Sequence, residues 1–453
     1  MLMFSLGLLP LLGPSATLNG ILGSRFRTDP VIASGDSIIQ LKMPPSIFLL
    51  LLVAGLLPTA RCNEVTSSPA TTQEPAERDT PCYQISANIA NFALNLYQQL
   101  ASDSNSTNIF FSPLSISSAF ALLSLGARSV THTQILEGLG FNLTRTSEAE
   151  IHKGFQDIVR SLARANSGLQ LDTGSALFVD NKLKLLERFL EDAKNLYSSE
   201  AFSTDFKDLA VAKKQINDYV EKGTHGQITE LIDDLHPASL LVLVNFIFFK
   251  AKWEKPFKME NTVEDDFFVD EKTTVRVPLM QRLGMFHYMY DSELSCNVVT
   301  MQYVGNATAY FVLPQQGKTK QVEDHLTKDR ILKWSESMKR RSLNLRFPKF
   351  SISGTYQLEK ILGKLGVTDV FTDKADLSGL TDQVHLKVSK AVHKAMLKVD
   401  EKGTEASAAT AVEAMPMSLP PTVTYNHPFL VIIYEKITQT MLFLGKIVNP
   451  TVP

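Results

Sequence analysis

One stretch constrains the fold of this chain more than any other: residues 403–421 read GTEASAATAVEAMPMSLPP. The first twelve of these residues are nearly all small, so they add little to a hydrophobic core. Strongly apolar stretches precede and follow them. The fold must therefore place a weak core-forming segment between two strong ones.

As an extended strand, residues 404–416 would cover about 43 Å at roughly 3.3 Å per residue, far beyond a mean strand. Alternating side chains would place small, uncharged residues on one face and both glutamates, Glu405 and Glu413, on the other. Because Ala and Glu are poor strand formers, the segment can become a long strand without being strongly driven to it. This pattern predicts two states, whereas composition alone favours a mobile alanine-rich loop.

Helical spacing dominates the first half of the chain, and strand patterns dominate the second. Apolar residues from Ile85 to Leu100 share one helical face, and Ser112-Pro113 opens a second helix. Further helices are expected at 182–197 and 213–222. Strands are expected at 240–249, 309–314, 342–352, 384–399, 429–434 and 441–448. Helices mostly before strands predict an α+β domain.

The N-terminal residues are typical of a leader. The apolar run from Ile47 to Leu57 is too short to span a bilayer and suits a signal-peptide core; the alternative is a buried helix. Small residues at the −3 and −1 positions, Ala60 and Cys62, predict cleavage after Cys62, so we interpret 43–62 as the signal peptide and 1–42 as an upstream extension. Residues 63–84 are polar and predict a flexible tail, which leaves 85–453 as a single folded domain.

Three glycosylation sequons agree with secretion; they begin at Asn105, Asn142 and Asn306. Beyond the leader only Cys82 and Cys296 remain, so the core must be stable without a disulfide framework. The net charge of −2 gives no reason to expect binding to nucleic acid or to an anionic membrane. We therefore predict a secreted, extracellular glycoprotein with neither of these partners.

Common motifs for catalysis and metal binding are absent from the sequence, which contains no His-Glu-x-x-His, Cys-x-x-Cys or Gly-x-Ser-x-Gly. Gly317-Lys318-Thr319 and Gly138-Leu139-Gly140 lack the further glycines of nucleotide-binding loops, and we interpret both as surface turns. The sequence therefore predicts no enzyme, no cofactor and no metal site.

The residues on either side of the small-residue stretch resemble those of the serpin family, clade A. The similarity lies in Val399-Asp400-Glu401-Lys402-Gly403-Thr404 before it, Tyr425-Asn426-His427-Pro428-Phe429-Leu430 after it, and the ending Gly445-Lys446-Ile447-Val448-Asn449-Pro450. Asn108–Ser115, Ile216–Val220 and residues 244–253 also match. The resemblance covers about residues 85–450.

The resemblance implies a metastable fold with a five-stranded central sheet, further sheets, about nine helices and an exposed reactive-centre loop at 401–424. It also implies a monomeric inhibitor that acts as a suicide substrate. A serine protease cleaves the loop and forms an acyl-enzyme, and the freed loop then inserts into the sheet and distorts the tethered protease. Loop insertion is a property of the family and is not worked out from these residues.

The same resemblance places the reactive bond at Met417–Ser418, with Met415, Pro416, Leu419 and Pro420 as its flanks. No Lys or Arg lies between Gly403 and Glu435, so a trypsin-like pocket has nothing to hold, whereas a shallow apolar pocket accepts Met417. The expected partners are therefore neutrophil elastase-like and chymotrypsin-like serine proteases, in covalent 1:1 complexes.

The resemblance also assigns a hinge, which consists of Glu401, Gly403, Thr404, Glu405, Ala406, Ser407, Ala408 and Ala409. Gly403 gives the backbone freedom, and Thr404 is small and uncharged. A charge at that position would be buried without a partner at a cost of roughly several kcal/mol, which would stall insertion. The hinge therefore favours an inhibitor over a non-inhibitory serpin.

Two supporting groups follow from the resemblance. Four polar residues match the cluster under the opening sheet that is called the shutter: Ser112, Ser115, Asn245 and His393. Polar groups within apolar stretches must satisfy one another, although His393 taken alone could equally be a core histidine. Trp253 and Lys349 match the top of the sheet, called the breach, where Lys349 is expected to pair with Glu401; otherwise Lys349 and Glu401 would be ordinary surface charges.

Two alternatives stay open. A hormone-carrying serpin would use the loop to tune ligand release, since fold does not determine function; a secreted hydrolase lacks any supporting motif. Five basic residues are compatible with weak heparin binding, but a solvated basic face is the favoured interpretation; they are Lys333, Lys339, Arg340, Arg341 and Arg346.

Overall fold

The computed structural model describes residues 81–103, 106–164, 169–402 and 419–452. The chain divides into two compact units, Met1–Thr71 and Thr72–Pro453, and the first lies outside the described residues. The predicted leader and most of the predicted tail therefore remain expectations. Helix α1 begins at Pro81, so residues 81–84 belong to a helix and not to the tail that the sequence predicted.

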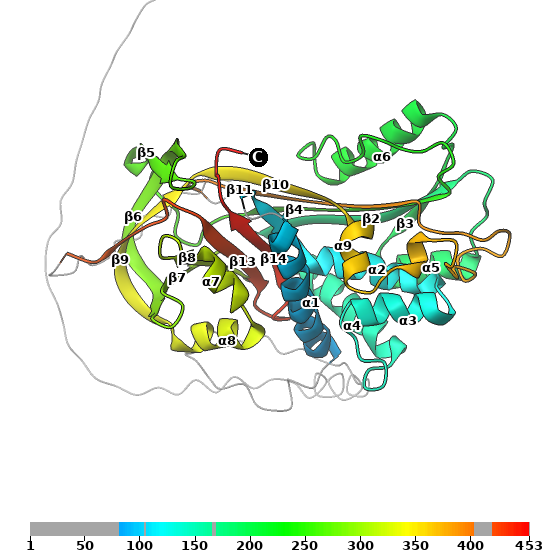
Figure 1. The fold of residues 1–453 in the computed structure, drawn as a ribbon, viewed down its shortest axis with the longest axis horizontal. Coiled ribbons are helices and arrows are strands. Elements are labelled where there is room, and N and C mark those ends of the chain that lie inside the picture. The colour runs from blue at the N-terminus through cyan, green and yellow to red at the C-terminus, as the bar shows by residue number, and fades with distance from the viewer. Residues whose placement is uncertain (1–80, 104–105, 165–168, 403–418, 453) are drawn as a thin grey trace, which may run out of the picture. The chain divides into compact units, whose positions relative to one another are not determined.

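The described residues contain nine α-helices and two short 3₁₀ helices (Figure 1). The α-helices are α1 (Pro81–Asp103), α2 (Pro113–Gly126), α3 (Ser129–Gly138), α4 (Glu148–Arg164), α5 (Glu187–Tyr197), α6 (Leu209–Gly223), α7 (Thr319–Asp324), α8 (Lys328–Ser337) and α9 (Leu358–Lys364). The 3₁₀ helices are η2 (Met259–Asn261) and η3 (Asp369–Phe371).

Fourteen strands of the described residues form two sheets. The five-stranded sheet has the order β10 (Phe350–Gln357), β11 (Lys390–Val399), β4 (Leu241–Ala251), β2 (Leu169–Asp180) and β3 (Glu200–Thr204). The nine-stranded sheet has the order β1 (Ile109–Phe111), β14 (Met441–Ile447), β13 (Phe429–Glu435), β8 (Ala307–Pro314), β7 (Cys296–Gln302), β6 (Thr274–Asp291), β9 (Lys339–Pro348) and β12 (Thr422–Thr424), with β5 (Val263–Phe268) paired to β6.

Helices cover both faces of the five-stranded sheet (Figure 1). Helix α6 packs on one face through a small core that includes Ile216, Phe178 and Val244. Helices α2 and α9 contact β4 and β11 from the large core, which continues into the nine-stranded sheet. The predicted α+β class and the five-stranded sheet are confirmed. Strand β4 is buried along its length except at Lys250, as its continuous apolar run predicts.

Three predicted elements differ from the structure. Helix α5 begins at Glu187 and not at residue 182, because Leu186 is extended and its N–H donates to Leu380 O (2.9 Å). Strand β11 begins at Lys390 and not at residue 384, because the preceding backbone pairs elsewhere. The stretch 342–352 is two strands in two sheets, which separate at Lys349, where the N–H donates to Pro278 O (2.9 Å).

Within the described residues no helix is long and apolar enough to span a membrane.

Candidate functional site

The central feature of the site is the seam between β4 and β11. These two strands run parallel, with Cα pairs from Lys390↔Val242 to Leu397↔Phe249. The small-residue stretch begins where β11 ends, so a strand formed by it after a reversal would run antiparallel to both neighbours. Antiparallel pairing is slightly more stable per residue than the parallel pairing it would replace. The seam is therefore the position in this sheet that suits a strand returning from β11.

A polar network crosses the seam at its middle, and it contains all four predicted shutter residues. Asn245 Oδ1 accepts hydrogen bonds from Ser115 Oγ (2.9 Å) and from His393 Nδ1 (2.6 Å). The amide nitrogen of Asn245 donates to Ser175 Oγ (2.9 Å). His393 and Asn245 face each other directly in the strand register. One amide thus ties β4 to β11, to β2 and to helix α2.

The protonation state of His393 follows from its two partners. Its Nε2 accepts the Ser112 N–H (3.2 Å), so the single proton of a neutral ring lies on Nδ1 and is donated to Asn245. Burial lowers the pKa of His393 to about 3, because no water solvates the imidazolium. The prediction that these four residues form one satisfied cluster is thus supported by their geometry, and His393 is neutral within it.

Several groups around the buried Glu401 hold the C-terminal end of β11 in place. Its two carboxylate oxygens accept from Thr262 Oγ1 and Lys349 Nζ, each at 2.9 Å. Burial raises the pKa of Glu401, but the bonds from Lys349, the backbone and Thr262 outweigh it, so the pKa lies below its ordinary value. Trp253 Nε1 donates to Asp400 O (3.0 Å), and the Trp253 ring stacks on Tyr303. The expected Lys349–Glu401 pair is therefore present.

The loop is anchored at its other end on the nine-stranded sheet. Strand β12 runs parallel to β9, with Thr422 opposite Asn344 and Thr424 opposite Arg346. Asn344 N donates to Pro421 O (3.0 Å), and Leu419 is 99% exposed. The two ends of the loop are therefore attached to different sheets.

The family model Serpin (serine protease inhibitor) matches residues 87–450. The chain belongs to the serpin family. It is 56% identical to alpha-1-antiproteinase of Bos taurus over 84% of this chain and 91% of that one. It is 55% identical to alpha-1-antitrypsin of Sus scrofa over 83% and 89%. Human thyroxine-binding globulin complexed with thyroxine aligns with a TM-score of 0.79 and 44% identity over 82% of this chain and 100% of that chain.

These comparisons agree with a relationship of this serpin to antitrypsin. Several predicted site residues lie outside the described residues: Gly403, Thr404, Glu405, Ala406, Ser407, Ala408, Ala409, Met415, Pro416, Met417, Ser418 and Asn105. Their roles remain predictions. Of the bait flanks, only the exposed Leu419 and the half-buried Pro420 are described.

Sequence reasoning missed two residues of this serpin's site. Ser175 completes the shutter, but it lies within the expected helical half and no strand was expected there. Thr262 binds Glu401 from just beyond η2, and nothing in its local sequence signals this contact. Both contacts join segments that are far apart in the chain, so local patterns could not reveal them.

Two further predictions concern the surface of the serpin. Asn142 is exposed and Asn306 is half-buried on the β7–β8 turn. Of the basic residues considered for heparin, Lys333 pairs with Glu293 (2.8 Å) and Arg346 pairs with Asp265 (2.6 Å). These two cations are neutralised locally, which favours the interpretation as a solvated basic face.

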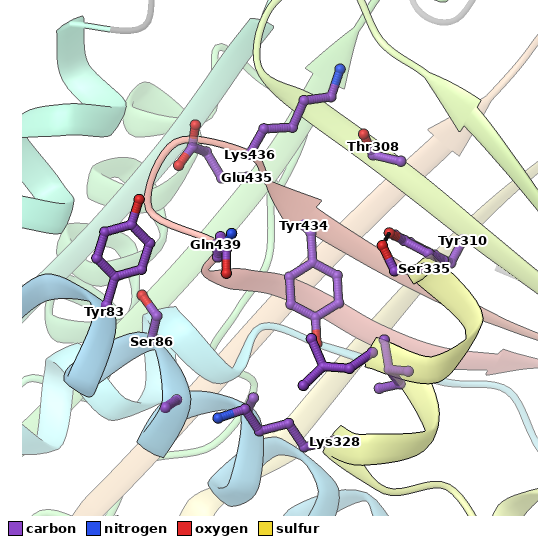
Figure 2. Close-up of a pocket in the computed structure, with 14 residues that line it drawn as sticks. Tyr83, Ser86, Thr308, Tyr310, Lys328, Ser335, Tyr434, Glu435, Lys436 and Gln439 are labelled. Atoms are coloured by element: carbon purple, nitrogen blue, oxygen red, sulfur yellow. Dashed lines mark hydrogen bonds between the residues drawn. The ribbon is translucent and has the colours of Figure 1, made fainter. Parts of the chain in front are cut away.

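A separate pocket of about 290 Å³ lies between α1, α8, β8 and the β13–β14 hairpin. Figure 2 shows Tyr434 between Tyr83 and Ser86 on one side and Tyr310 on the other. The rings of Tyr310 and Tyr434 meet edge to face at 6.0 Å, and Tyr310 donates to Ser335 Oγ (3.3 Å). Aromatic walls with a few polar groups are typical of small-molecule sites.

Proposed function

We propose that this serpin inhibits serine proteases as a suicide substrate and that its loop inserts between β4 and β11. The observation that carries the proposal is the parallel seam, which a strand returning from β11 would fill with antiparallel partners on both sides. The hydrogen bonds of the four-residue polar network at the middle of the seam can be exchanged for others as β4 and β11 separate. The network is therefore suited to act as the gate that opens the sheet for insertion.

The different burial of the two faces of β11 supports insertion of the loop beside this strand. Ala391, His393, Ala395 and Leu397 are buried on one face, whereas Lys394 and Met396 are only half-buried on the other and Lys398 is exposed. A neighbouring strand from residues 404–416 can place its uncharged face on the buried side. Glu405 and Glu413 then lie on the side of Lys394 and Lys398, where their charges can be paired or solvated.

The proposed chemistry begins when the protease serine attacks the carbonyl carbon of Met417. The Met417–Ser418 peptide bond breaks, the protease histidine protonates the amine of Ser418, and an ester joins Met417 to the enzyme. Release of the new end lets the loop insert and carry the protease with it. Distortion of the oxyanion hole then prevents water from hydrolysing the ester.

Met417 determines the proposed partner class. Its unbranched apolar side chain suits the pocket of elastase-like or chymotrypsin-like proteases, and the loop offers no cation to a trypsin-like pocket. We further propose secretion, from the apolar run at 47–57 and the sequons, of which Asn142 is exposed. Secretion would bring the inhibitor to extracellular proteases of this class.

The test is to mix the purified protein with neutrophil elastase and, separately, with chymotrypsin. The proposal predicts a band at the summed mass on denaturing gels and a released peptide that begins at Ser418. Cleavage without a stable complex by both enzymes, and by trypsin, would contradict the proposal. A stable complex with cleavage at another bond would retain the mechanism and move the reactive bond.

A second candidate is a carrier of a small apolar molecule, and the pocket lined by Tyr83, Tyr310 and Tyr434 is the observation that favours it. The solved relative that is named thyroxine-binding globulin is in complex with thyroxine. Tight binding of an aromatic ligand, lost on Tyr434→Ala, with no covalent protease complex would favour the carrier. A covalent complex without ligand binding would favour the inhibitor.

A further inference from the structure

The face of β11 that is turned away from the large core carries a lysine at every fourth position. Lys390, Lys394 and Lys398 share this face, because side chains alternate between the two faces of a sheet. Residues of the other face, such as Ala391 and Leu397, belong to the large core. The three lysines therefore form a row along one side of the seam.

The three lysines differ in what they already bind. Lys390 pairs with Asp234 from the segment before β4, and its side chain is only 12% exposed. Lys394 donates to Glu230 O (2.7 Å). Lys398 is exposed and has no ion pair with any residue that the structure describes. The end of the row next to the loop is therefore open to an acidic partner, whereas the far end is occupied.

A further lysine lies across the seam from the open end. The parallel register of β11 and β4 places Leu397 beside Phe249, so the next residues along the two strands, Lys398 and Lys250, face each other. Lys250 is half-buried. A strand inserted between β4 and β11 would therefore have a lysine on each side at this level.

The anchored end of β11 limits where a returning strand can begin. The backbone carbonyl groups of 401–402 accept hydrogen bonds from the N–H groups of Phe257 (2.7 Å) and Trp253 (3.2 Å). Gly403 follows them and tolerates the backbone conformations that a sharp turn needs. Since a short connection costs the least closure entropy, the favoured turn that keeps both hydrogen bonds spans residues 400–403.

This turn determines the register of a returning strand, because it pairs the last residue of β11 with Thr404. Along the two antiparallel strands, Glu405 then comes opposite Lys398, and Glu413 comes opposite Lys390. The two glutamates are as far apart as the two lysines, about 26 Å at roughly 3.3 Å per residue. A single register therefore gives both glutamates a lysine at the same time.

The neighbouring registers leave the glutamates without cations on β11. A shift of one residue turns both side chains toward the large core. A shift of two residues places Glu405 opposite Met396 in one direction and opposite Asp400 in the other. In either direction Glu413 meets a valine that is 2% exposed. The charges of β11 and of the loop thus favour one register and disfavour its neighbours.

We propose that Lys398 and Lys390 set the register of the inserted loop by pairing with Glu405 and Glu413. This inference rests on the proposed inhibitory function. Lys398 is open and receives Glu405 first, whereas Glu413 must displace Asp234 from Lys390 at the end of insertion. The lysines are positioning residues, because they place the strand and do not touch the protease. A strand that enters in the correct register inserts sooner and leaves less time for hydrolysis of the ester.

The test exchanges the charges of the first pair. The variants are Lys398→Glu, Glu405→Lys and the two combined, with Lys398→Arg as the variant that keeps the charge. The matched control is Lys360→Glu, at an exposed lysine on α9. The first measurement is the amount of inhibitor consumed per trapped enzyme. The second is the guanidinium midpoint of unfolding, for the intact protein and for protein cleaved between Glu413 and Ser418.

We expect Lys398→Glu and Glu405→Lys each to raise the inhibitor consumed in excess of one per trapped enzyme roughly two- to fivefold, because like charges then face each other. The midpoint of the cleaved protein falls, whereas that of the intact protein does not change. The combined variant recovers most of both losses; recovery is incomplete because Lys250 keeps its charge beside the pair. Lys398→Arg and Lys360→Glu behave as the unchanged protein, and added salt reduces every difference.

Two results would overturn the inference while leaving inhibition intact. One is a covalent complex whose stoichiometry and cleaved-state midpoint are the same in all variants. The other is a combined variant that recovers nothing, because the two charges then do not act on each other. If the unchanged protein forms no covalent complex with any serine protease and cleavage does not stabilise it, the proposed function fails and the register fails with it.

Discussion

Replacing Asn245 by alanine should damage the seam more than any other single change in the shutter. The amide accepts from the buried Ser115 and His393 and donates to the half-buried Ser175. Alanine leaves three polar groups without their partner, at about 1–3 kcal/mol for each group. Serine hydroxyls can rotate toward other acceptors, so we expect a total loss of about 3–6 kcal/mol.

The assay is the free energy of unfolding from urea titration followed by circular dichroism. Ser175→Ala should lose only about 1 kcal/mol, because it removes a single bond. The matched control Asn181→Ala, on the exposed turn after β2, should change stability by less than about 0.5 kcal/mol. A loss below about 1 kcal/mol for Asn245→Ala would refute the claim that the polar network holds β4 and β11 together.

Three further predictions follow from the same structure. The pKa of His393 is lower in the folded protein than in the unfolded protein, so the contribution of His393 to stability is complete above about pH 6.5. This contribution is lost as the pH falls toward 3, by at most about 1.4 kcal/mol per pH unit, and the free energy of unfolding measured at several pH values should show this slope. The variant His393→Gln should reduce the slope, whereas the control His225→Gln, at an exposed histidine, should not. The Glu323 carboxylate pairs with Lys446 at 2.9 Å with both side chains buried, so Glu323→Val should cost about 3–5 kcal/mol, and adding Lys446→Met should restore much of the loss in calorimetry. Oxidising Met417 to the sulfoxide makes the bait polar and should slow elastase inhibition, whereas a Met417→Val protein treated with the same oxidant should keep its rate.

The sequence predicted those elements whose residues have one environment along their whole length. Strand β4 is apolar throughout and buried on both faces, and it was found within two residues at each end. Strand β6 was missed, because its exposed positions carry a mixture of Leu283, His287 and charged residues. Strands β2 and β3 were missed because they lie among helices, and their pairing with β4 depends on contacts distant in the chain.

The site divides in the same way. The shutter residues were found from their resemblance to serpins, and the reason they meet is the register that places His393 opposite Asn245. The partner Ser175 depends on a strand that the sequence did not reveal. The predicted ends of helices and strands were wrong where backbone groups form hydrogen bonds with remote segments, as Leu186 does with Leu380. The sequence therefore located the site residues, whereas their partners became clear only from the pairing of strands in the folded protein.

The most direct measurement of the central claim is the heat stability of the protein after cleavage within residues 403–418. If the loop inserts between β4 and β11, the cleaved protein should retain its C-terminal fragment and unfold at a clearly higher temperature than the intact protein. Unfolding of the cleaved protein at the same or a lower temperature would contradict insertion, and with it the proposed inhibitory mechanism.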